Sequence, residues 1–303
     1  MASAIVQFAV GLLLAPLLLT VIRRVKAFFG GRHGPTVMQP YIDLAKLARK
    51  TPVYSRTTTW VFKVSPVVGM AASIAALSIL PQSGVPALAA FPGDFVFLAY
   101  VFGMMRFFTV LAALDTGSPF EGMGASREVQ FAVLSEVALF SCLIALVIAL
   151  DATSLGSIFA IAWGPAVQPG AAGILVLVAC AMMLILLCEN SRIPVDDPTT
   201  HLELTMIHEV MVLDHCGLDL AMIEYASALK LWIWSAIVVS LALPVRTGSP
   251  WLDLLAGTIG IFILGAVIGV IESIMARLRL LKVPQLLVAA CVLALLAVGL
   301  GLR

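Results

Sequence analysis

The sequence predicts an all-α polytopic membrane protein with about eight transmembrane helices and short amphipathic helices in the cytoplasmic loops. Three observations lead to this fold class. Of the 303 residues, 61% are hydrophobic and 12% are charged, and the mean hydropathy is +1.09. Soluble domains carry about 25% charged residues, so lipid is the expected solvent for most of this chain. Apolar stretches of transmembrane length recur along the sequence, and Lys and Arg gather in alternate loops.

The apolar stretches are long enough to cross a bilayer as helices. They lie near residues 4–22, 62–80, 94–114, 130–150, 171–188, 228–245, 252–273 and 284–302. Helices are expected because lipid offers no water to unpaired backbone groups, and the stretches lack the alternation of barrel strands. No internal repeat or low-complexity tract divides the chain, so residues 1–303 are expected to form a single integral membrane domain. Gly265 and Gly269 form a small-xxx-small pair that favours close helix packing.

Lys and Arg set the predicted topology. Residues 23–63 carry nine of them, and Arg127, Arg192, Arg277, Arg279 and Lys282 lie in later loops on the same side. The opposite side has Arg246 and Arg303. The positive-inside rule therefore predicts a multi-pass protein of the inner (cytoplasmic) membrane with both termini outside. The positive charges follow the first apolar stretch, which is typical of a retained helix rather than a cleaved signal.

The charged loops are the expected docking side for a soluble partner. The cations expected to grip it are Arg23, Arg24, Arg32, Lys46, Arg49 and Lys50. The net charge of +1 gives no reason to expect nucleic acid as a partner. The loops on the opposite side are short and nearly uncharged.

The chain shows no catalytic machinery of its own. Its five cysteines have no CxxC spacing, so they are expected to be small buried side chains and not iron–sulfur ligands. His201, His208 and His215 recur every seven residues, a spacing that does not favour a metal site. No phosphate-binding loop, dinucleotide fingerprint or nucleophile elbow occurs in the sequence. We therefore expect no metal and no catalytic residue in this chain.

Ionisable residues at membrane depth are costly and mark functional candidates. They are Arg106, Glu136, Lys230 and Glu272. Arg106 and Lys230 have two equal interpretations, a structural ion pair and a functional role. Glu136 either pairs with Arg106 or titrates. Glu189 and Glu272 lie nearer the interface, where a solvated role is equally expected.

Residues 189–224 are unusually acidic. This stretch holds eight of the 17 acids, namely Glu189, Asp196, Asp197, Glu203, Glu209, Asp214, Asp219 and Glu224. Its histidines are His201, His208 and His215 and its one Lys or Arg is Arg192. A solvated acidic loop is the usual explanation. Because apolar residues alternate with these acids, short helices partly immersed at the membrane surface are favoured, where acids and histidines relay protons.

The same stretch resembles a known family. Glu189-Asn-Ser-Arg-Ile-Pro-Val-Asp196 is similar to the ETNRxPFD loop of the subunit-1 (H-subunit) family of respiratory complex I, which includes membrane subunits of hydrogenase-4 and formate hydrogenlyase complexes. Further matches are Gly34-Pro35, Gln39-Pro40, Asp43-Leu-Ala-Lys-Leu47, Asp115-Thr-Gly-Ser-Pro119, Gly124-Ala-Ser-Arg-Glu128, His201-Leu-Glu-Leu-Thr-Met-Ile-His-Glu209, Ile223-Glu-Tyr225 and Met275-Ala-Arg-Leu-Arg279. Together they cover about residues 23–280.

The resemblance implies partners, cofactors and site residues. It implies a cytoplasmic arm with a hydrogenase-like large subunit and an iron–sulfur small subunit, and antiporter-like membrane subunits alongside. Iron–sulfur clusters, with or without a nickel–iron centre, would lie in those partners and not in this chain. The implied redox-cavity loop comprises Glu189, Arg192, Asp196 and Asp197. The proton path expected from the residues and the resemblance comprises Glu136, Glu203, Glu209, Glu224, Asp196, His208, Arg106 and Lys230.

The branch of the family decides the expected electron acceptor. The loop continues as Pro194-Val-Asp-Asp-Pro-Thr-Thr-His-Leu-Glu-Leu204, which is similar to the hydrogenase-4 branch and departs from the quinone-reducing enzymes. We therefore expect a membrane anchor and proton-coupling subunit of a group-4 hydrogenase or formate hydrogenlyase complex. The alternatives are the quinone-site subunit of an NADH:quinone oxidoreductase-like complex, a stand-alone ion transporter and a purely structural anchor. Inverted repeats, which many transporters show, are not seen here.

Overall fold

The computed structural model describes residues 1–162, 171–196, 206–243 and 247–302. Regular secondary structure in this part of the chain is helical, apart from an isolated bridge between Gln82 and Val85. Eight of its helices are long and apolar enough to cross a membrane. They are α1 (Ala2–Phe29), α3 (Trp60–Ile79), α4 (Asp94–Asp115), α5 (Pro119–Leu150), α7 (Ala171–Glu189), α8 (Gly217–Ala242), α9 (Pro250–Ile274) and α10 (Val283–Gly301), which continues from η2 (Leu280–Lys282). The predicted all-α fold with eight spans is confirmed.

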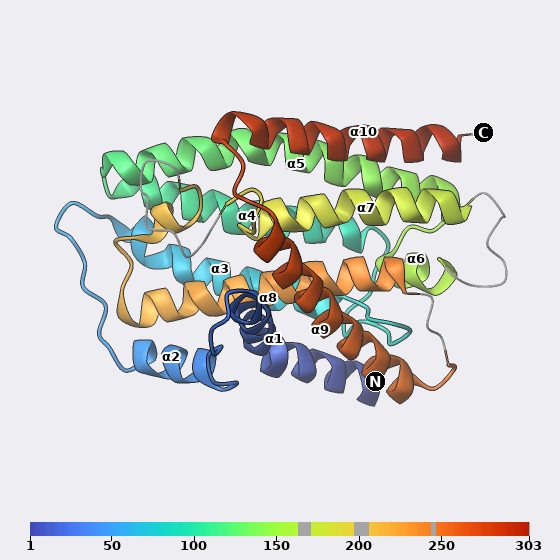
Figure 1. The fold of residues 1–303 in the computed structure, drawn as a ribbon, viewed down its shortest axis with the longest axis horizontal. Helices are drawn as coiled ribbons and strands as arrows, with labels where there is room; N and C mark the ends of the chain where they lie inside the picture. Colours follow the sequence, from blue (N-terminus) through green and yellow to red (C-terminus); the bar gives the residue numbers. More distant parts are fainter. Residues whose placement is uncertain (163–170, 197–205, 244–246, 303) are drawn as a thin grey trace.

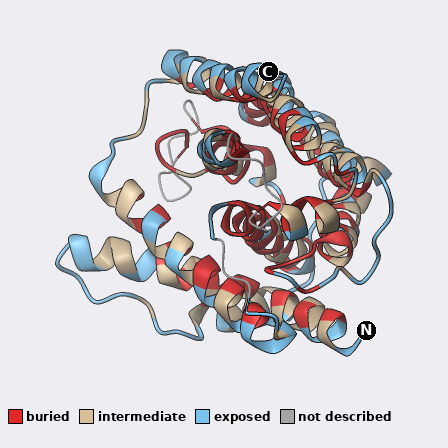
Figure 2. Cartoon of the chain, turned by 90° about the vertical axis from the view of Figure 1, so that its right-hand side faces the viewer, coloured by how far each residue is buried: buried red, intermediate tan, exposed pale blue. Residues whose placement is uncertain are grey.

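The long helices form one bundle whose two ends differ in character. Both chain termini lie at one end, called the terminal end below (Figure 1). The charged end carries the connections 30–59 and 275–279 and the described parts of 190–216. Helix α8 is the most buried span, with Trp232 and Trp234 fully enclosed, and it contacts α1, α3, α7 and α9. Figure 2 shows the buried residues gathered where the helices face one another.

Two helices extend well beyond the apolar stretches that predicted them. The fourth stretch was expected at 130–150, but α5 begins at Pro119; the sixth was expected at 228–245, but α8 begins at Gly217. The additional turns contain acids, and hydropathy counts such residues as loop. They are helical because the protein itself buries them: Glu121, Glu128 and Asp219 are all buried. The polar parts of these helices therefore face protein and not lipid.

Shorter helices lie in the connections. Helix α2 (Gln39–Ala48) and the 3-10 helix η1 (Glu209–Val212) lie at the charged end, where short amphipathic helices were expected. Helix α6 (Leu155–Ile161) on the opposite side was not predicted. It begins with a capping box between Ser154 and Ser157, and Asp94 of α4 accepts a hydrogen bond of 2.7 Å from the Leu155 amide. The start of α6 is therefore set by polar capping groups. A hydropathy profile does not detect such groups, so the helix was missed.

The glycine pair of α9 lets α1 approach closely. A methyl group at Gly269 would lie 2.8 Å from Val25 Cβ and 3.1 Å from the Ile22 carbonyl oxygen, and at Gly265 it would collide with Leu18. The predicted close packing at Gly265 and Gly269 is confirmed. This contact brings the C-terminal part of α1 against α9, beside the cavity described next.

Candidate functional site

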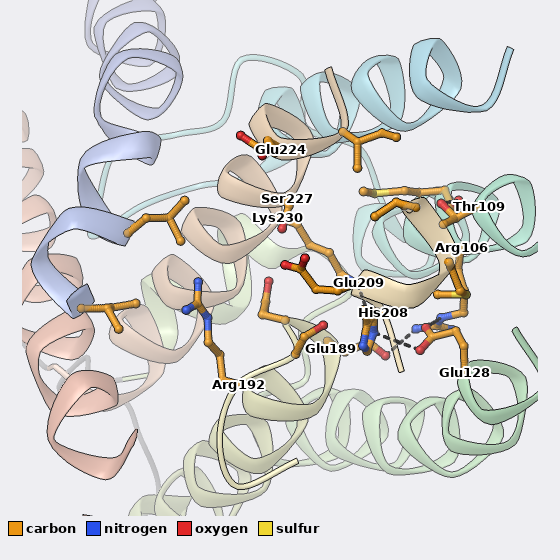
Figure 3. A pocket seen from close by; sticks show the side chains of 18 of the residues that line it. Arg106, Thr109, Glu128, Glu189, Arg192, His208, Glu209, Glu224, Ser227 and Lys230 are labelled. Atoms are coloured by element: carbon orange, nitrogen blue, oxygen red, sulfur yellow. Dashed lines mark hydrogen bonds and ion pairs between the residues drawn. The ribbon is translucent and has the colours of Figure 1, made fainter. Parts of the chain in front are cut away.

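A cavity of about 270 Å³ opens between α1, α4, α5, α8 and α9 toward the charged end. The loop after α7 and the segment 208–212 complete its wall (Figure 3). Its ionisable lining residues are Arg23, Lys26, Arg106, Arg192 and Lys230, with Glu128, Glu189, Glu209, Glu224 and Glu272, and His208. Besides His208, the lining holds five basic and five acidic side chains, so their formal charges balance.

Arg106 of α4 joins three carboxylates from two neighbouring helices. Its Nε lies 3.0 Å from Glu128 Oε1 and its Nη1 lies 2.6 Å from Glu136 Oε1, both on α5. Its Nη2 pairs with Glu189, the last residue of α7. A guanidinium suits this role because its N–H groups point in fixed directions within one plane. Of the two interpretations of Glu136, pairing with Arg106 is the one the structure supports.

Glu189 connects Arg106 to α8. Its Oε2 lies 2.9 Å from Lys230 Nζ, and its Oε1 accepts a hydrogen bond of 2.7 Å from Ser135. A carboxylate at the C-terminal end of a helix faces the negative end of the helix dipole, so it needs nearby cations. Arg106 and Lys230 supply them, which explains how Glu189 is held although it is buried.

His208 adds a titratable group to the same cluster. Its Nε2 lies 2.9 Å from Glu128 Oε2. Burial alone would lower the pKa of His208, but the adjacent Glu128 carboxylate outweighs burial and raises it. We call Arg106, Glu128, Glu136, Glu189, His208 and Lys230 the Arg106 cluster. Two fixed cations face three carboxylates in it, so a proton on His208 makes the cluster neutral.

A second ion group closes the other side of the cavity. Glu272 of α9 has a side chain that is 1% exposed, and it lies 2.9 Å from Lys26 Nζ and 3.5 Å from Arg192 Nη1. Burial lowers the pKa of Arg192, and Glu272 opposes this effect. Next to it, Asp196 pairs with Arg277 at 2.8 Å and accepts the Ile207 amide at 2.9 Å. Asp196 therefore holds the segment that carries His208.

Glu136 differs from the other acids in facing outward. Its side chain is 49% exposed, whereas those of Glu128 and Glu189 are each 6% exposed. Its neighbours Val133 and Val137 on α5 are also exposed. At 1.5 Å per residue, Glu136 lies about 21 Å from the terminal end of α5, within a hydrocarbon core that is about 30 Å thick. Glu136 is therefore the member of the Arg106 cluster that reaches the outer, apolar side of the bundle.

Nearer the terminal end, part of the bundle interior is apolar. A small cavity of about 20 Å³ there is lined by apolar side chains, among them Phe102, Leu143, Met182 and Trp234. Phe102 and Trp234 stack with ring centroids 5.9 Å apart. No ionisable residue lines this cavity in the described part of the chain.

The structure brings most predicted site residues together. Arg106, Glu189, His208 and Lys230 form the cluster with Glu136, and Glu209, Glu224 and Arg192 line the cavity. Asp196 lies beside it, while Glu203 and Asp197 fall outside the described residues. Of the cations expected to dock a partner, Arg23 lines the cavity, and Arg24, Arg32, Lys46, Arg49 and Lys50 are exposed near the charged end.

Three central residues were not among the predicted site residues. Glu128, Lys26 and Glu272 were left out of that set, although Glu272 was noted as a charge at membrane depth. Glu128 lies two turns from Glu136 on α5, and it was counted as a loop residue because the apolar stretch begins at 130. Extending the predicted helix to Pro119 would have placed both acids on one helix beside Arg106.

Comparison with known proteins agrees with this picture. A family model described as NADH dehydrogenase matches residues 2–301. The chain is 30% identical to hydrogenase-4 component C of Escherichia coli (strain K12) over 244 residues, covering 80% of this chain and 75% of that protein. It is also 30% identical to formate hydrogenlyase subunit 4 of the same organism over 301 residues, covering 97% and 95% of the two chains.

A solved structure shares the fold. A chain of the membrane-bound sulfane sulfur reductase, an archaeal respiratory membrane complex, aligns with a TM-score of 0.82 and 19% identity over 98% of both chains. The family resemblance predicted from the loop motifs is confirmed. The chain therefore belongs to the NADH dehydrogenase family, as a complex I subunit 1-like membrane protein related to hydrogenase-4 component C and formate hydrogenlyase subunit 4.

Proposed function

We propose that this chain anchors a cytoplasmic electron-transfer arm to the membrane and passes the resulting charge change to a neighbouring membrane subunit as protons. The observation that carries the proposal is the continuous contact from His208 through Glu128 and Arg106 to the half-exposed Glu136. The complex would be of the group-4 membrane-bound hydrogenase or formate hydrogenlyase type, as the names of the two relatives suggest.

The relay begins at the cavity. Electron transfer in a docked arm changes the charge near the segment 206–212, and the balanced lining responds by gaining or losing a proton. His208 is the group suited to this exchange, because its pKa is raised and its Nε2 contacts a buried carboxylate. Glu209 and Glu224 on the cavity wall, with Glu203 in the same stretch, are the further acids proposed for this path.

The exit of the relay is lateral. Towards the terminal end, the described residues around the small cavity are apolar, which disfavours a path straight across this chain. Glu136 pairs with Arg106 through one oxygen but stays 49% exposed at membrane depth, where a carboxylate facing lipid costs several kcal/mol, of the order of 3. A polar or titratable side chain of an antiporter-like subunit would satisfy it. This arrangement also disfavours a stand-alone transporter.

The proposed orientation places the charged end in the cytoplasm and both termini outside, in the inner (cytoplasmic) membrane. The distribution of Lys and Arg supports it. The exposed cations of 24–50 would then contact the hydrogenase-like large subunit and the iron–sulfur small subunit. Iron–sulfur clusters, with or without a nickel–iron centre, are proposed for those partners.

Purification of the tagged chain from its native membrane in mild detergent tests the assignment of partners. Mass spectrometry is expected to identify a hydrogenase-like large subunit, a cluster protein and antiporter-like subunits, with nickel in the same sample. A sample with bound quinone and no nickel would favour the quinone-site alternative. A chain recovered alone would overturn both readings.

Glu136→Gln tests the relay itself. The amide keeps an oxygen for Arg106 but does not exchange a proton at neutral pH, so electron transfer from a reduced viologen dye is expected to continue. Proton movement by the complex in sealed vesicles is expected to fall to the level seen with an uncoupler. Asp151→Asn is the matched control, since Asp151 is an exposed carboxylate at the terminal end of α5, outside the cavity lining. Intact proton movement in Glu136→Gln would establish a purely structural anchor.

A further inference from the structure

Pro16 interrupts the hydrogen-bond ladder of α1 inside its membrane span. Proline has no amide hydrogen, so the carbonyl of Leu12, four residues earlier, loses its helical donor. Pro16 is buried, so the Leu12 carbonyl is expected to need a donor from within the protein. In Figure 1 the N-terminal part of α1 runs along the long axis, whereas the C-terminal part is seen nearly end-on. The change of direction is the kink expected at a proline.

Two tyrosines from other helices contact the carbonyls at this kink. The Tyr225 hydroxyl of α8 donates a hydrogen bond of 2.8 Å to the Leu12 carbonyl oxygen. The Tyr41 hydroxyl of α2 donates to the neighbouring Leu13 carbonyl oxygen. Tyr225 thus replaces the donor that Pro16 removes. In a regular helix the Leu17 amide donates to the Leu13 carbonyl, so Tyr41 is expected to have the smaller effect.

Beyond the kink, residues 17–29 form a covering segment over the cavity. Leu19, Ile22, Arg23 and Lys26 line the cavity from this segment. On one side the segment packs on α9 through Gly265 and Gly269, and Lys26 pairs with Glu272.

On its other side the covering segment contacts the chain that leads into α2. Arg24 Nε donates to the Pro35 carbonyl oxygen at 2.9 Å, and Thr20 Oγ1 donates to the Val37 carbonyl oxygen at 3.4 Å. The segment is therefore held along its length, and its angle to the rest of α1 is set at the kink.

We propose that Tyr225, with a smaller contribution from Tyr41, is a positioning residue that fixes the covering segment over the cavity. Tyr225 follows Glu224, which lines the cavity from the opposite wall. The hydrogen bond to Leu12 therefore sets how far the α1 wall with Arg23 and Lys26 stands from the α8 wall with Glu224. This inference concerns the geometry of the cavity and does not depend on the proposed proton relay.

Hydrogen–deuterium exchange on the purified native complex tests it. In Tyr225→Phe, the Leu12 carbonyl loses its donor, and one such hydrogen bond corresponds to about five- to tenfold faster exchange of amides in residues 17–29. Tyr41→Phe is the matched control and is expected to change exchange less. Amides of α10, remote from the kink, report on general loosening and are expected to stay unchanged.

Pro16→Ala separates a positioning role from general packing. Alanine restores an amide that bonds the Leu12 carbonyl, so Tyr225→Phe is expected to have no further effect in the Pro16→Ala background. A Tyr225→Phe chain that folds only when Pro16→Ala is also present supports the proposal equally. Equal acceleration in both backgrounds, or no acceleration in the native background, would overturn it, whatever the Glu136 experiment shows.

Discussion

His208 of the segment after α7 and Glu128 of α5 form an ion pair, with Nε2 and Oε2 2.9 Å apart. The pair connects the acidic stretch to the membrane-embedded Arg106, which contacts the other oxygen of the same carboxylate. A loop residue and a helix residue therefore act as one titrating unit. Its properties differ from those of an isolated histidine.

His208→Gln is expected to change how stability depends on pH. The pKa of His208 is raised in the folded chain, so its protonated form stabilises the fold fully at pH below the ordinary value of 6.5. This contribution, about 1.5–3 kcal/mol for a hydrogen bond to a charged group, disappears as pH rises through the raised pKa. Thermal unfolding followed by tryptophan fluorescence should show the largest gap between wild type and variant at pH 6 and a smaller one at pH 9.

His215→Gln serves as the control because His215 titrates in the opposite direction. Burial lowers the pKa of His215 to about 4, and its ring stacks on Phe62 with centroids 3.9 Å apart. Its neutral form stabilises the fold above pH 6.5, and this contribution decreases as pH falls toward 4. A gap for His208→Gln that follows the pattern of His215→Gln would contradict the ion pair.

Gly124→Ala is expected to displace the segment that carries His208. A methyl group at Gly124 would collide with Val210 and lie 2.9 Å from the Ile207 carbonyl oxygen, a backbone atom that does not yield easily. Such overpacking costs about 1–3 kcal/mol. Because His208 follows Ile207, the variant should also lose much of the pH-dependent stability described above.

Gly122→Ala is a matched control on the same helix. No heavy atom lies within 4 Å of a methyl group placed there, so alanine should be neutral or stabilise α5 by up to about 1 kcal/mol. Equal destabilisation by both substitutions would show that helix α5 responds to any added methyl group. The contact of Gly124 with the segment that carries His208 would then not explain the effect.

The sequence predicted the spans well because lipid imposes one simple rule on them. Apolar length and backbone hydrogen bonding determine a transmembrane helix, and both can be read locally. The cost of charge at membrane depth likewise identified Arg106, Glu136 and Lys230 before any contact was known. Their pairing in one cluster follows the same physics, because buried charges need partners.

The parts that could not be predicted depend on contacts between distant segments. From the sequence alone, Glu128 is assigned to a loop, because the apolar stretch does not show that α5 begins at Pro119. Lys26 is likewise assigned as a charge flanking a span, because its partner Glu272 lies on α9. The role of Tyr225 depends on a carbonyl of another helix. Hydropathy and motif spacing carry no information about such pairs, whose residues are far apart along the chain.

Glu272→Gln is expected to destabilise the chain more than Lys26→Met. The Glu272 carboxylate is enclosed between Lys26 and Arg192, so its loss leaves two cations facing each other, with a cost of about 3–5 kcal/mol. In Lys26→Met the carboxylate keeps Arg192 at 3.5 Å, so one cation still balances it and the loss is expected to be smaller than for Glu272→Gln. Thermal unfolding of the purified complex gives both values on one scale.

Glu272→Asp distinguishes charge from packing at this position. It keeps the negative charge but shortens the side chain by one methylene group, so its stability should lie between wild type and Glu272→Gln. If Glu272→Gln unfolded at the same temperature as wild type, Lys26 and Arg192 would have to be hydrated by water in the cavity. The second ion group would then be a solvated edge of the cavity, and α1 would be held on α9 by the contacts at Gly265 and Gly269 alone.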